Sequence, residues 1–166
     1  CLVNPDSIKK ADLKVIYTPL NGAGNKPVRK VLKMAGITDV TVVKEQEKPD
    51  GNFPTVSYPN PEAAEAFHLG LKLAREIDAD GLLILTAEGK AYINYNTPEQ
   101  QALDELTIEE ASNYIQSGHF AKGSMLPKVE ACMEFVRGNS GKKAIIGSLE
   151  KASAAINGMS GTIIKG

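Results

Sequence analysis

The sequence is poor in the residues that build cross-linked or metal-stabilised domains. Its 166 residues include two cysteines, Cys1 and Cys132, and two histidines, His68 and His119. Two cysteines are too few for a disulfide framework or a zinc site. Cys132 shares a helical face with apolar neighbours, which predicts a core position. We therefore expect no bound metal and no other cofactor.

Long apolar runs and an excess of one charge are also lacking. No run approaches the roughly 20 apolar residues that span a bilayer, and the first six residues lack the layout of a signal peptide. The 19 lysines and arginines nearly balance the 20 aspartates and glutamates, for a net charge of −1. Such a balance gives no long-range field toward anionic partners. We expect a soluble, cytoplasmic protein that binds neither nucleic acid nor membrane.

The hydrophobic pattern alternates between helix and strand periods. Apolar residues recur at spacings of three and four from Pro61 to Ile77, and the apolar run Leu82–Leu85 predicts a strand buried on both faces. Gly81 is expected to stop the helix in a left-handed conformation. Further strands are expected within 13–17, 40–43, 92–95, 142–147 and 162–164, and helices within 2–11, from about 27 to 36, 107–118, from 127 and within 149–156.

These elements predict an α/β fold in one domain over residues 1–166. We expect a three-layer sandwich with a mainly parallel sheet of five or six strands and helices on both faces. The sheet would be continuous if Leu82–Leu85 paired beside Val15–Tyr17.

Two glycines follow the first predicted strand. Gly22 and Gly24 precede a helix expected to begin near Pro27, so free backbone N–H groups there could bind phosphate. The third glycine of a dinucleotide fingerprint and the Gly-Lys-Ser/Thr of a P-loop are both lacking. A tight turn between strand and helix is the alternative interpretation.

Three stretches of the first half resemble the second domain of the phosphoglucomutase/phosphomannomutase family. They are Tyr17–Gly24, Lys44–Val56 and Tyr58–Glu62, and the resemblance covers about residues 1–78. Asn21 stands where that family usually has histidine. The family's phosphoserine loop, its magnesium-binding Asp-x-Asp-x-Asp loop and its sugar-recognition loop are not part of this segment. The resemblance therefore implies an incomplete mutase site.

From Ala79 to the end, the chain resembles the C-terminal part of carbamate kinase, of the amino-acid kinase family. The stretches that carry this resemblance are Leu83–Thr86, Tyr92–Tyr95, Gly118–Ala131, Lys143–Ile146 and Gly161–Ile164. In that fold, this half contributes the adenine and phosphate side of the nucleotide site. The glycine-rich loops that hold carbamate belong to the other half.

The segment after Gly123 is the best candidate for a nucleotide site. Pro127 is expected to begin a helix, and Lys128 near its start is unfavourable for the helix dipole unless an anion is present. Together with the resemblance, this indicates that Tyr92, Met125, Pro127 and Lys128 bind nucleotide. A solvated lysine is the alternative.

The histidines and paired carboxylates favour structural roles. His68 is expected at the surface of its helix, and His119 lies in a loop where a general base would need a pocket wall that the chain lacks. Two carboxylate pairs, Glu45 with Glu47 and Glu109 with Glu110, are expected to be solvated. Thr107 with Glu110 forms a capping box at a helix start.

The resemblances to parts of two families lead to three hypotheses about the function of this chain. We expect a recombined or engineered chimera without catalytic activity, which a chain that begins at Cys1 also suggests. The alternative is a residual module that binds nucleotide or phosphate weakly. A third hypothesis is an enzyme fragment that works only with a partner chain. Halves of larger proteins expose surfaces that the rest of the protein once covered. We therefore expect a homodimer, formed through an apolar patch or a sheet edge.

Overall fold

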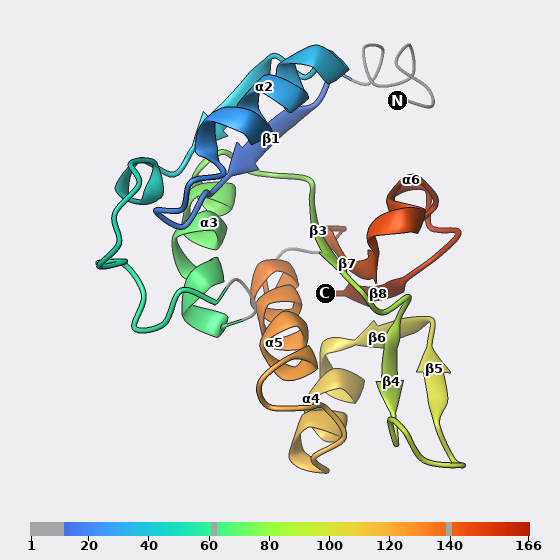
Figure 1. Cartoon of the computed structure of the whole chain (residues 1–166). Helices are drawn as coiled ribbons and strands as arrows, with labels where there is room; N and C mark the ends of the chain where they lie inside the picture. Colours follow the sequence, from blue (N-terminus) through green and yellow to red (C-terminus); the bar gives the residue numbers. More distant parts are fainter. Residues whose placement is uncertain (1–11, 61–62, 139–140) are drawn as a thin grey trace. The chain divides into compact units, whose positions relative to one another are not determined.

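The computed structural model describes residues 12–60, 63–138 and 141–166 (Figure 1). The chain divides into two compact units. Unit 1 contains residues 12–60 and 65–76, and unit 2 contains 63–64 and the described part of 77–166. The expectations for residues 2–11, Cys1 and Pro61 lie outside the described residues. The expectation of one domain stays a prediction, and each unit is described by itself.

Unit 1 combines a two-stranded parallel sheet with two helices. The strands β1 and β2 pair with Val15 opposite Val40 and Tyr17 opposite Val42. The elements in chain order are β1 (Lys14–Tyr17), α2 (Asn25–Ala35), β2 (Asp39–Val42), the short helix η1 (Lys44–Gln46) and α3 (Ala64–Glu76). The strand-helix-strand order predicted for this half is therefore present.

The ends of α2 follow from backbone chemistry. The helix begins at Asn25, two residues before the predicted start, so Pro27 occupies the third helical position. Proline is tolerated there because the first turn has no intrahelical acceptor for its N–H. Gly36 ends the helix with φ of 95°, and Ile37 N–H donates to the carbonyl of Leu32 at 3.0 Å. The helix therefore ends at the glycine where the sequence predicts its end, through a left-handed cap.

Unit 2 is built on a four-stranded sheet in the order β3-β7-β8-β6. The pairs β3–β7 and β6–β8 are parallel, and β7–β8 is antiparallel. The strands are β3 (Gly81–Thr86), β4 (Ala91–Ile93), β5 (Gln101–Leu103), β6 (Glu105–Thr107), β7 (Lys143–Ser148) and β8 (Thr162–Lys165). The helices are α4 (Ile108–Gln116), α5 (Met125–Val136), the short η2 (Leu149–Lys151) and α6 (Ala152–Ile156).

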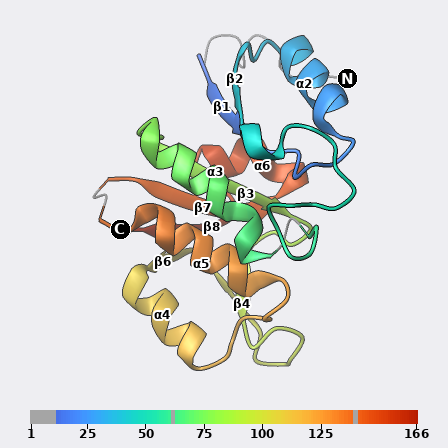
Figure 2. The same cartoon turned by 90° about the vertical axis from the view of Figure 1, so that its left-hand side faces the viewer.

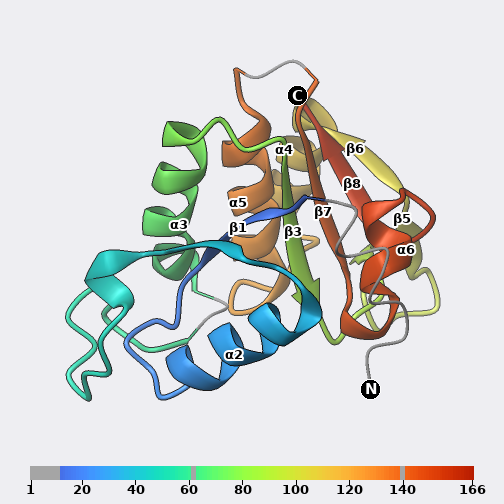
Figure 3. The same ribbon diagram turned by 90° about the horizontal axis from the view of Figure 1, so that it is seen from above.

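Helices cover both faces of the sheet of unit 2. Figures 2 and 3 show α4 and α5 on one face and α6 on the other. The interior is apolar, and its large side chains that are fully buried include Phe135, Val136, Ile146 and Ile164. The expected α/β class, with a mainly parallel sheet and helices on both faces, is confirmed, but the largest sheet among the described residues has four strands and not the expected five or six.

The position of β3 differs from the prediction. Leu82–Leu85 pairs with residues 144–147 of β7, whereas Val15–Tyr17 pairs with β2. Because β3 is the last strand of its four-stranded sheet, Ile84 is its one buried residue, and Leu85 is 38% exposed. An apolar run does not reveal which strand it will pair with.

The turn before β3 also differs. The left-handed residue is Asp78, with φ of 52°, whereas Gly81 is the first residue of β3 and has no positive φ. Aspartate is one of the few residues other than glycine that tolerate this conformation. A Cβ at Gly81 would lie 3.4 Å from the Lys143 carbonyl oxygen, which is an ordinary contact distance.

Candidate functional site

The first turn of α5 brings together three of the predicted nucleotide-binding residues. The helix begins at Met125, so Pro127 is its third residue. Ser124 precedes the helix without a side-chain cap, and Leu126 N–H donates to the Ala121 carbonyl at 3.0 Å. With Leu126 engaged and Pro127 lacking an N–H, few backbone donors remain for an anion. Anion binding here would depend on a side-chain cation.

Lys128 places a cationic side chain in this first turn, and it is 3% exposed. Its Nζ donates to the Ser124 carbonyl oxygen at 3.1 Å, which holds the side chain along the first turn. The alternative of a solvated lysine is therefore wrong. Placing an ammonium group at the positive end of a helix is unfavourable, and burial adds a desolvation cost.

Tyr92 lies in a different element, the antiparallel hairpin of β4 and β5. Its ring centroid is 5.8 Å from that of Tyr95, with the planes tilted by 46°. Tyr95 Oη donates to Glu88 Oε1 at 2.8 Å, and this hydrogen bond to a carboxylate raises the pKa of Tyr95. The hairpin therefore presents two neighbouring aromatic rings, and the ring of Tyr95 is held by its hydrogen bond to Glu88.

The two glycines predicted to bind phosphate lie in unit 1. Gly22 N–H donates to the Pro19 carbonyl at 2.8 Å, so this donor is already used. Gly24 directly precedes α2, and Val28 N–H donates back to its carbonyl at 3.0 Å. The loop has the hydrogen bonds of a tight turn, which is the alternative that the sequence left open.

Asn21 in this loop has a role that the sequence did not indicate. It is 5% exposed and left-handed, with φ of 56°. Its Nδ2 donates to the carbonyls of Glu45 and Lys48 at 3.2 and 2.9 Å, and its Oδ1 accepts from Thr55 Oγ1 at 3.3 Å. Asparagine, which favours left-handed turns, here ties two loops together. These contacts join residues 24 to 34 positions apart, so no local pattern could show them.

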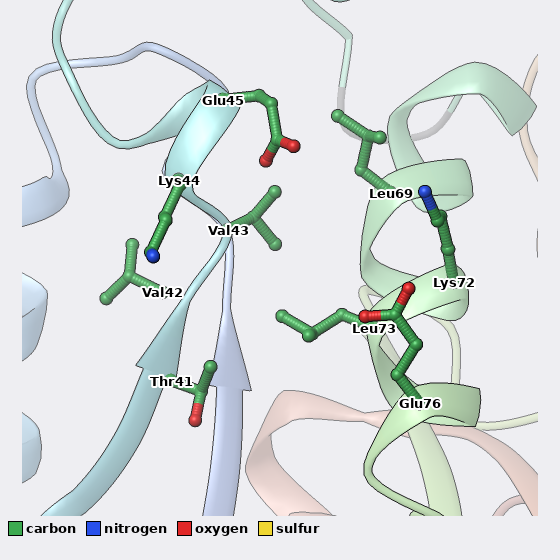
Figure 4. Close-up of a pocket in the computed structure, with 9 residues that line it drawn as sticks. All are labelled: Thr41, Val42, Val43, Lys44, Glu45, Leu69, Lys72, Leu73 and Glu76. Atoms are coloured by element: carbon green, nitrogen blue, oxygen red, sulfur yellow. The ribbon is translucent and has the colours of Figure 1, made fainter.

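A cavity of about 270 Å³ lies within unit 1, between β2 with η1 on one side and α3 on the other. Figure 4 shows Val43 and Leu73 pointing toward each other across it. Its charged lining residues are all exposed, and none of its polar lining residues is buried. A ligand would find no fixed polar group to orient it. The charged lining residues are Lys44, Glu45, Lys72 and Glu76.

The remaining candidates have structural positions. His68 is exposed on α3, and His119 packs edge-on against Tyr114 with ring centroids 5.6 Å apart. Cys132 is a free thiol, fully buried, and desolvation raises its pKa. Among the described residues, no group of three or more His, Cys, Asp and Glu side chains could hold a metal ion. In the same part of the chain, no helix combines the length and apolar character needed to cross a membrane.

The second segment has natural relatives in several bacteria. Carbamate kinase of Clostridium perfringens is 56% identical over 93 residues, which are 56% of this chain and 30% of that enzyme. Carbamate kinase of Staphylococcus haemolyticus is 40% identical over 131 residues, which are 79% of this chain and 40% of that enzyme. The chain thus spans less than half the length of these relatives.

Solved structures give the same result for the fold. A carbamate kinase structure from Giardia matches with a TM-score of 0.58 and 31% identity, covering 84% of this chain and 47% of that one. Carbamate kinase from Giardia lamblia bound to AMP-PNP matches with a TM-score of 0.55 and 28% identity, covering 86% of this chain and 44% of that one.

These findings contradict the leading hypothesis from the sequence. An engineered chimera without catalytic activity, and the expectation that the chain is no enzyme, are both wrong, because the matched relatives are natural enzymes named carbamate kinase. The missing parts of each active site led to that error. A chain that covers 30 to 40% of its relatives can lack those parts without being artificial.

Two families are matched along the chain. The amino acid kinase family matches residues 69–148. The phosphoglucomutase/phosphomannomutase family, through its alpha/beta/alpha domain II, matches residues 2–89. The second match takes in more than half of the chain, so this protein belongs to the phosphoglucomutase/phosphomannomutase family and joins a segment of its domain II to one that resembles carbamate kinase.

Proposed function

We propose that the chain contributes the nucleotide-binding side of a kinase of the carbamate kinase type. Unit 2 would hold the phosphates of ATP at the start of α5, with Lys128 as the cation and Met125 and Pro127 shaping the turn. Tyr92 on the β4–β5 hairpin would contact the nucleotide. The activity is the one for which the relatives are named, and transfer of a phosphoryl group would need the carbamate-holding half as well.

The observation that carries this proposal is the buried ammonium group of Lys128. Lys128 is 3% exposed in the first turn of α5, and its Nζ is held on the Ser124 carbonyl oxygen at the start of the helix. Sites that bind phosphate combine a lysine with a helix start. The 56% identity over 93 residues to a carbamate kinase supports the same assignment.

A thermal-shift titration with magnesium-ATP tests the proposal. Ligand that binds the folded chain at 100 times its Kd stabilises it by about 2.7 kcal/mol, so a clear rise in Tm is expected. Glucose 1-phosphate and carbamoyl phosphate are run in parallel, and neither should raise Tm as magnesium-ATP does. A shift with glucose 1-phosphate alone would favour the mutase segment and contradict the proposal.

Two lysine variants make the test specific. Lys128→Met keeps the aliphatic volume but removes the charge, and it should abolish the shift with magnesium-ATP. Lys122→Met, an exposed lysine of the preceding loop, should leave the shift unchanged. Equal shifts in both variants and in the unmodified chain would show that Lys128 does not hold the phosphates.

A further inference from the structure

One hydroxyl group of β8 bonds both strands of the β4–β5 hairpin. Thr162 is fully buried at the first position of β8. Its Oγ1 accepts from Ala91 N–H at 2.8 Å and donates to the Leu103 carbonyl oxygen. Ala91 and Leu103 are paired with each other at the base of the hairpin. One side chain therefore satisfies a donor on one strand and an acceptor on the other.

Two further contacts surround this hydroxyl. Lys90 and Asp104, the residues next to Ala91 and Leu103, form an ion pair across the base of the hairpin. Ile163 N–H donates to the Asp104 carbonyl at 2.9 Å. The Thr162 hydroxyl is fully buried and bonds both strands. The Asp104 carboxylate of the ion pair, by contrast, is 81% exposed. Exposed ion pairs contribute little by comparison.

The rest of the hairpin is braced by its own contacts. Its tip is closed by short-range hydrogen bonds, among them Thr97 Oγ1 to the Asn94 carbonyl at 2.9 Å and Asn96 N–H to Gln100 Oε1 at 2.8 Å. Tyr95 is bonded to Glu88 at the other end of β4. A hairpin that is internally braced moves as one body, so its base decides where Tyr92 lies.

We propose that Thr162 is a positioning residue, whose hydroxyl fixes the hairpin on β8 and thereby holds Tyr92 in place for the nucleotide. This inference rests on the proposed function. Thr162 lies 70 positions from Tyr92 and is fully buried, so it would act through the hairpin and not by contact with the nucleotide. Without its hydroxyl, Ala91 N–H and the Leu103 carbonyl lose their partner inside the protein, and the hairpin separates to regain water.

Thr162→Val is the decisive variant because valine has nearly the volume of threonine but no hydroxyl. In the full chain, hydrogen exchange at residues 91–93 and 101–103 should accelerate by at least about tenfold, the equivalent of one unsatisfied buried group. The Kd for magnesium-ATP should rise by a similar factor. Thr162→Ser, which retains the hydroxyl, should restore both values.

Ile164→Val is the matched control. It removes a methylene group from a fully buried residue of the same strand and leaves the hydroxyl intact. It should lower Tm without changing the Kd for magnesium-ATP or the exchange of the hairpin. A loss of affinity in Ile164→Val equal to that in Thr162→Val would mean that β8 acts only through general stability, which overturns the proposal.

The two measurements separate the possible failures. Unchanged exchange of the hairpin in Thr162→Val would overturn the anchoring role. Faster exchange with an unchanged Kd would overturn the positioning of the nucleotide by this hairpin. If the unmodified chain binds no magnesium-ATP, the proposed function fails and the nucleotide part of this inference fails with it, while the exchange data still decide whether Thr162 anchors the hairpin.

Discussion

Among the glycines of unit 2 that the structure describes, Gly161 has the closest neighbour to an added Cβ. Its φ is 91°, and a Cβ there would lie 2.7 Å from the Ile146 carbonyl oxygen, which is part of β7. Both the conformation and the space therefore require glycine. The close approach lets β8 begin directly beside β7.

Gly161→Ala should lower the free energy of unfolding by at least about 1 kcal/mol, because the backbone strain and the clash add to each other. Urea denaturation followed by circular dichroism measures the change. Gly89→Ala serves as the control, since nothing lies within 4 Å of a Cβ there and φ is not positive. Equal stability of the two variants would contradict the close approach seen at Gly161.

The ion pair of Asp78 with Lys142 predicts a dependence on pH. Their atoms are 2.6 Å apart, and Lys142, which lies over the ring of Phe135, holds the pKa of Asp78 below its usual range through the hydrogen bond and its charge. A carboxylate whose pKa is lowered in the folded state stabilises that state at pH values above its unfolded pKa. This stabilisation is lost as the pH falls through the folded pKa.

Asp78→Asn should therefore have a lower Tm than the unmodified chain at pH 7. This difference in Tm should shrink toward zero as the pH falls below about 4. Asparagine is a suitable replacement because it also accepts the left-handed conformation of this position. Asp80→Asn, which removes an exposed carboxylate two residues away, should show no such trend. A difference that is independent of pH would show that the ion pair does not contribute.

Among the elements, α4 shows how much a local signal can predict. Thr107 accepts from Glu110 N–H at 3.2 Å, and the Glu110 carboxylate accepts from Thr107 N–H at 2.8 Å, as the capping box in the sequence predicts. Gly118 then ends the turn with φ of 74°. Both signals depend on residues three or four positions apart, so neither needs knowledge of the rest of the fold.

Thr107→Ala should destabilise unit 2 by about 1 kcal/mol, the usual cost of losing such a cap. Thr107→Ser keeps the accepting oxygen and should cost much less. Chemical denaturation of the two variants gives the comparison. If serine were as destabilising as alanine, the effect would come from β6, in which Thr107 also lies, rather than from the cap.

The elements that sequence analysis missed lack such local signals. The strands β5 and β6 have three residues each and include the polar residues Gln101 and Glu105, so neither gives a hydrophobic period. Their positions depend on pairing with β4 and β8. The presence or absence of a local signal also explains which site residues the sequence could predict. Lys128 could be found from its place after Pro127, whereas Thr162 acts over contacts 59 and 71 positions long.

On the scale of the whole molecule, the two units differ in the kind of side chain that is fully buried in each. The large side chains that are fully buried in unit 2 are mostly apolar, whereas the one in unit 1 is Gln46. Gln46 Nε2 donates to Thr55 Oγ1 at 3.1 Å, and Asn21 N–H donates to the Gln46 carbonyl at 2.8 Å. Unit 1 thus combines a two-stranded sheet with a fully buried polar side chain as well as buried apolar ones. The sequence predicted both strands of unit 1, and it predicted the strands of unit 2 except β5 and β6, but it did not predict this contrast.

Backbone amides of β1 and β2 should therefore exchange hydrogen faster than those of β7 and β8. A two-stranded sheet is marginally stable on its own, and exchange follows local stability. Mass spectrometry of peptides that cover 14–17, 39–42, 143–148 and 162–165 measures the difference. Equal protection of all four strands would show that the two units unfold together.

Self-association remains a prediction, and α2 offers the residues for its test. Val31 and Met34 are 61% and 70% exposed on this helix. Light scattering at high concentration should detect dimers that Val31→Glu with Met34→Glu converts to monomers. Lys30→Glu alters charge on the same helix without removing apolar surface, and it should leave the dimers intact. A monodisperse monomer of the unmodified chain would contradict the prediction.

Because Cys132 is buried, its reaction with thiol reagents can report the opening of unit 2. Alkylating reagents attack the thiolate, and this thiol is free, fully buried and held protonated by its surroundings. Its labelling must wait until α5 leaves the sheet. The labelling rate of Cys132 therefore measures how often that part of the protein opens, without any added probe.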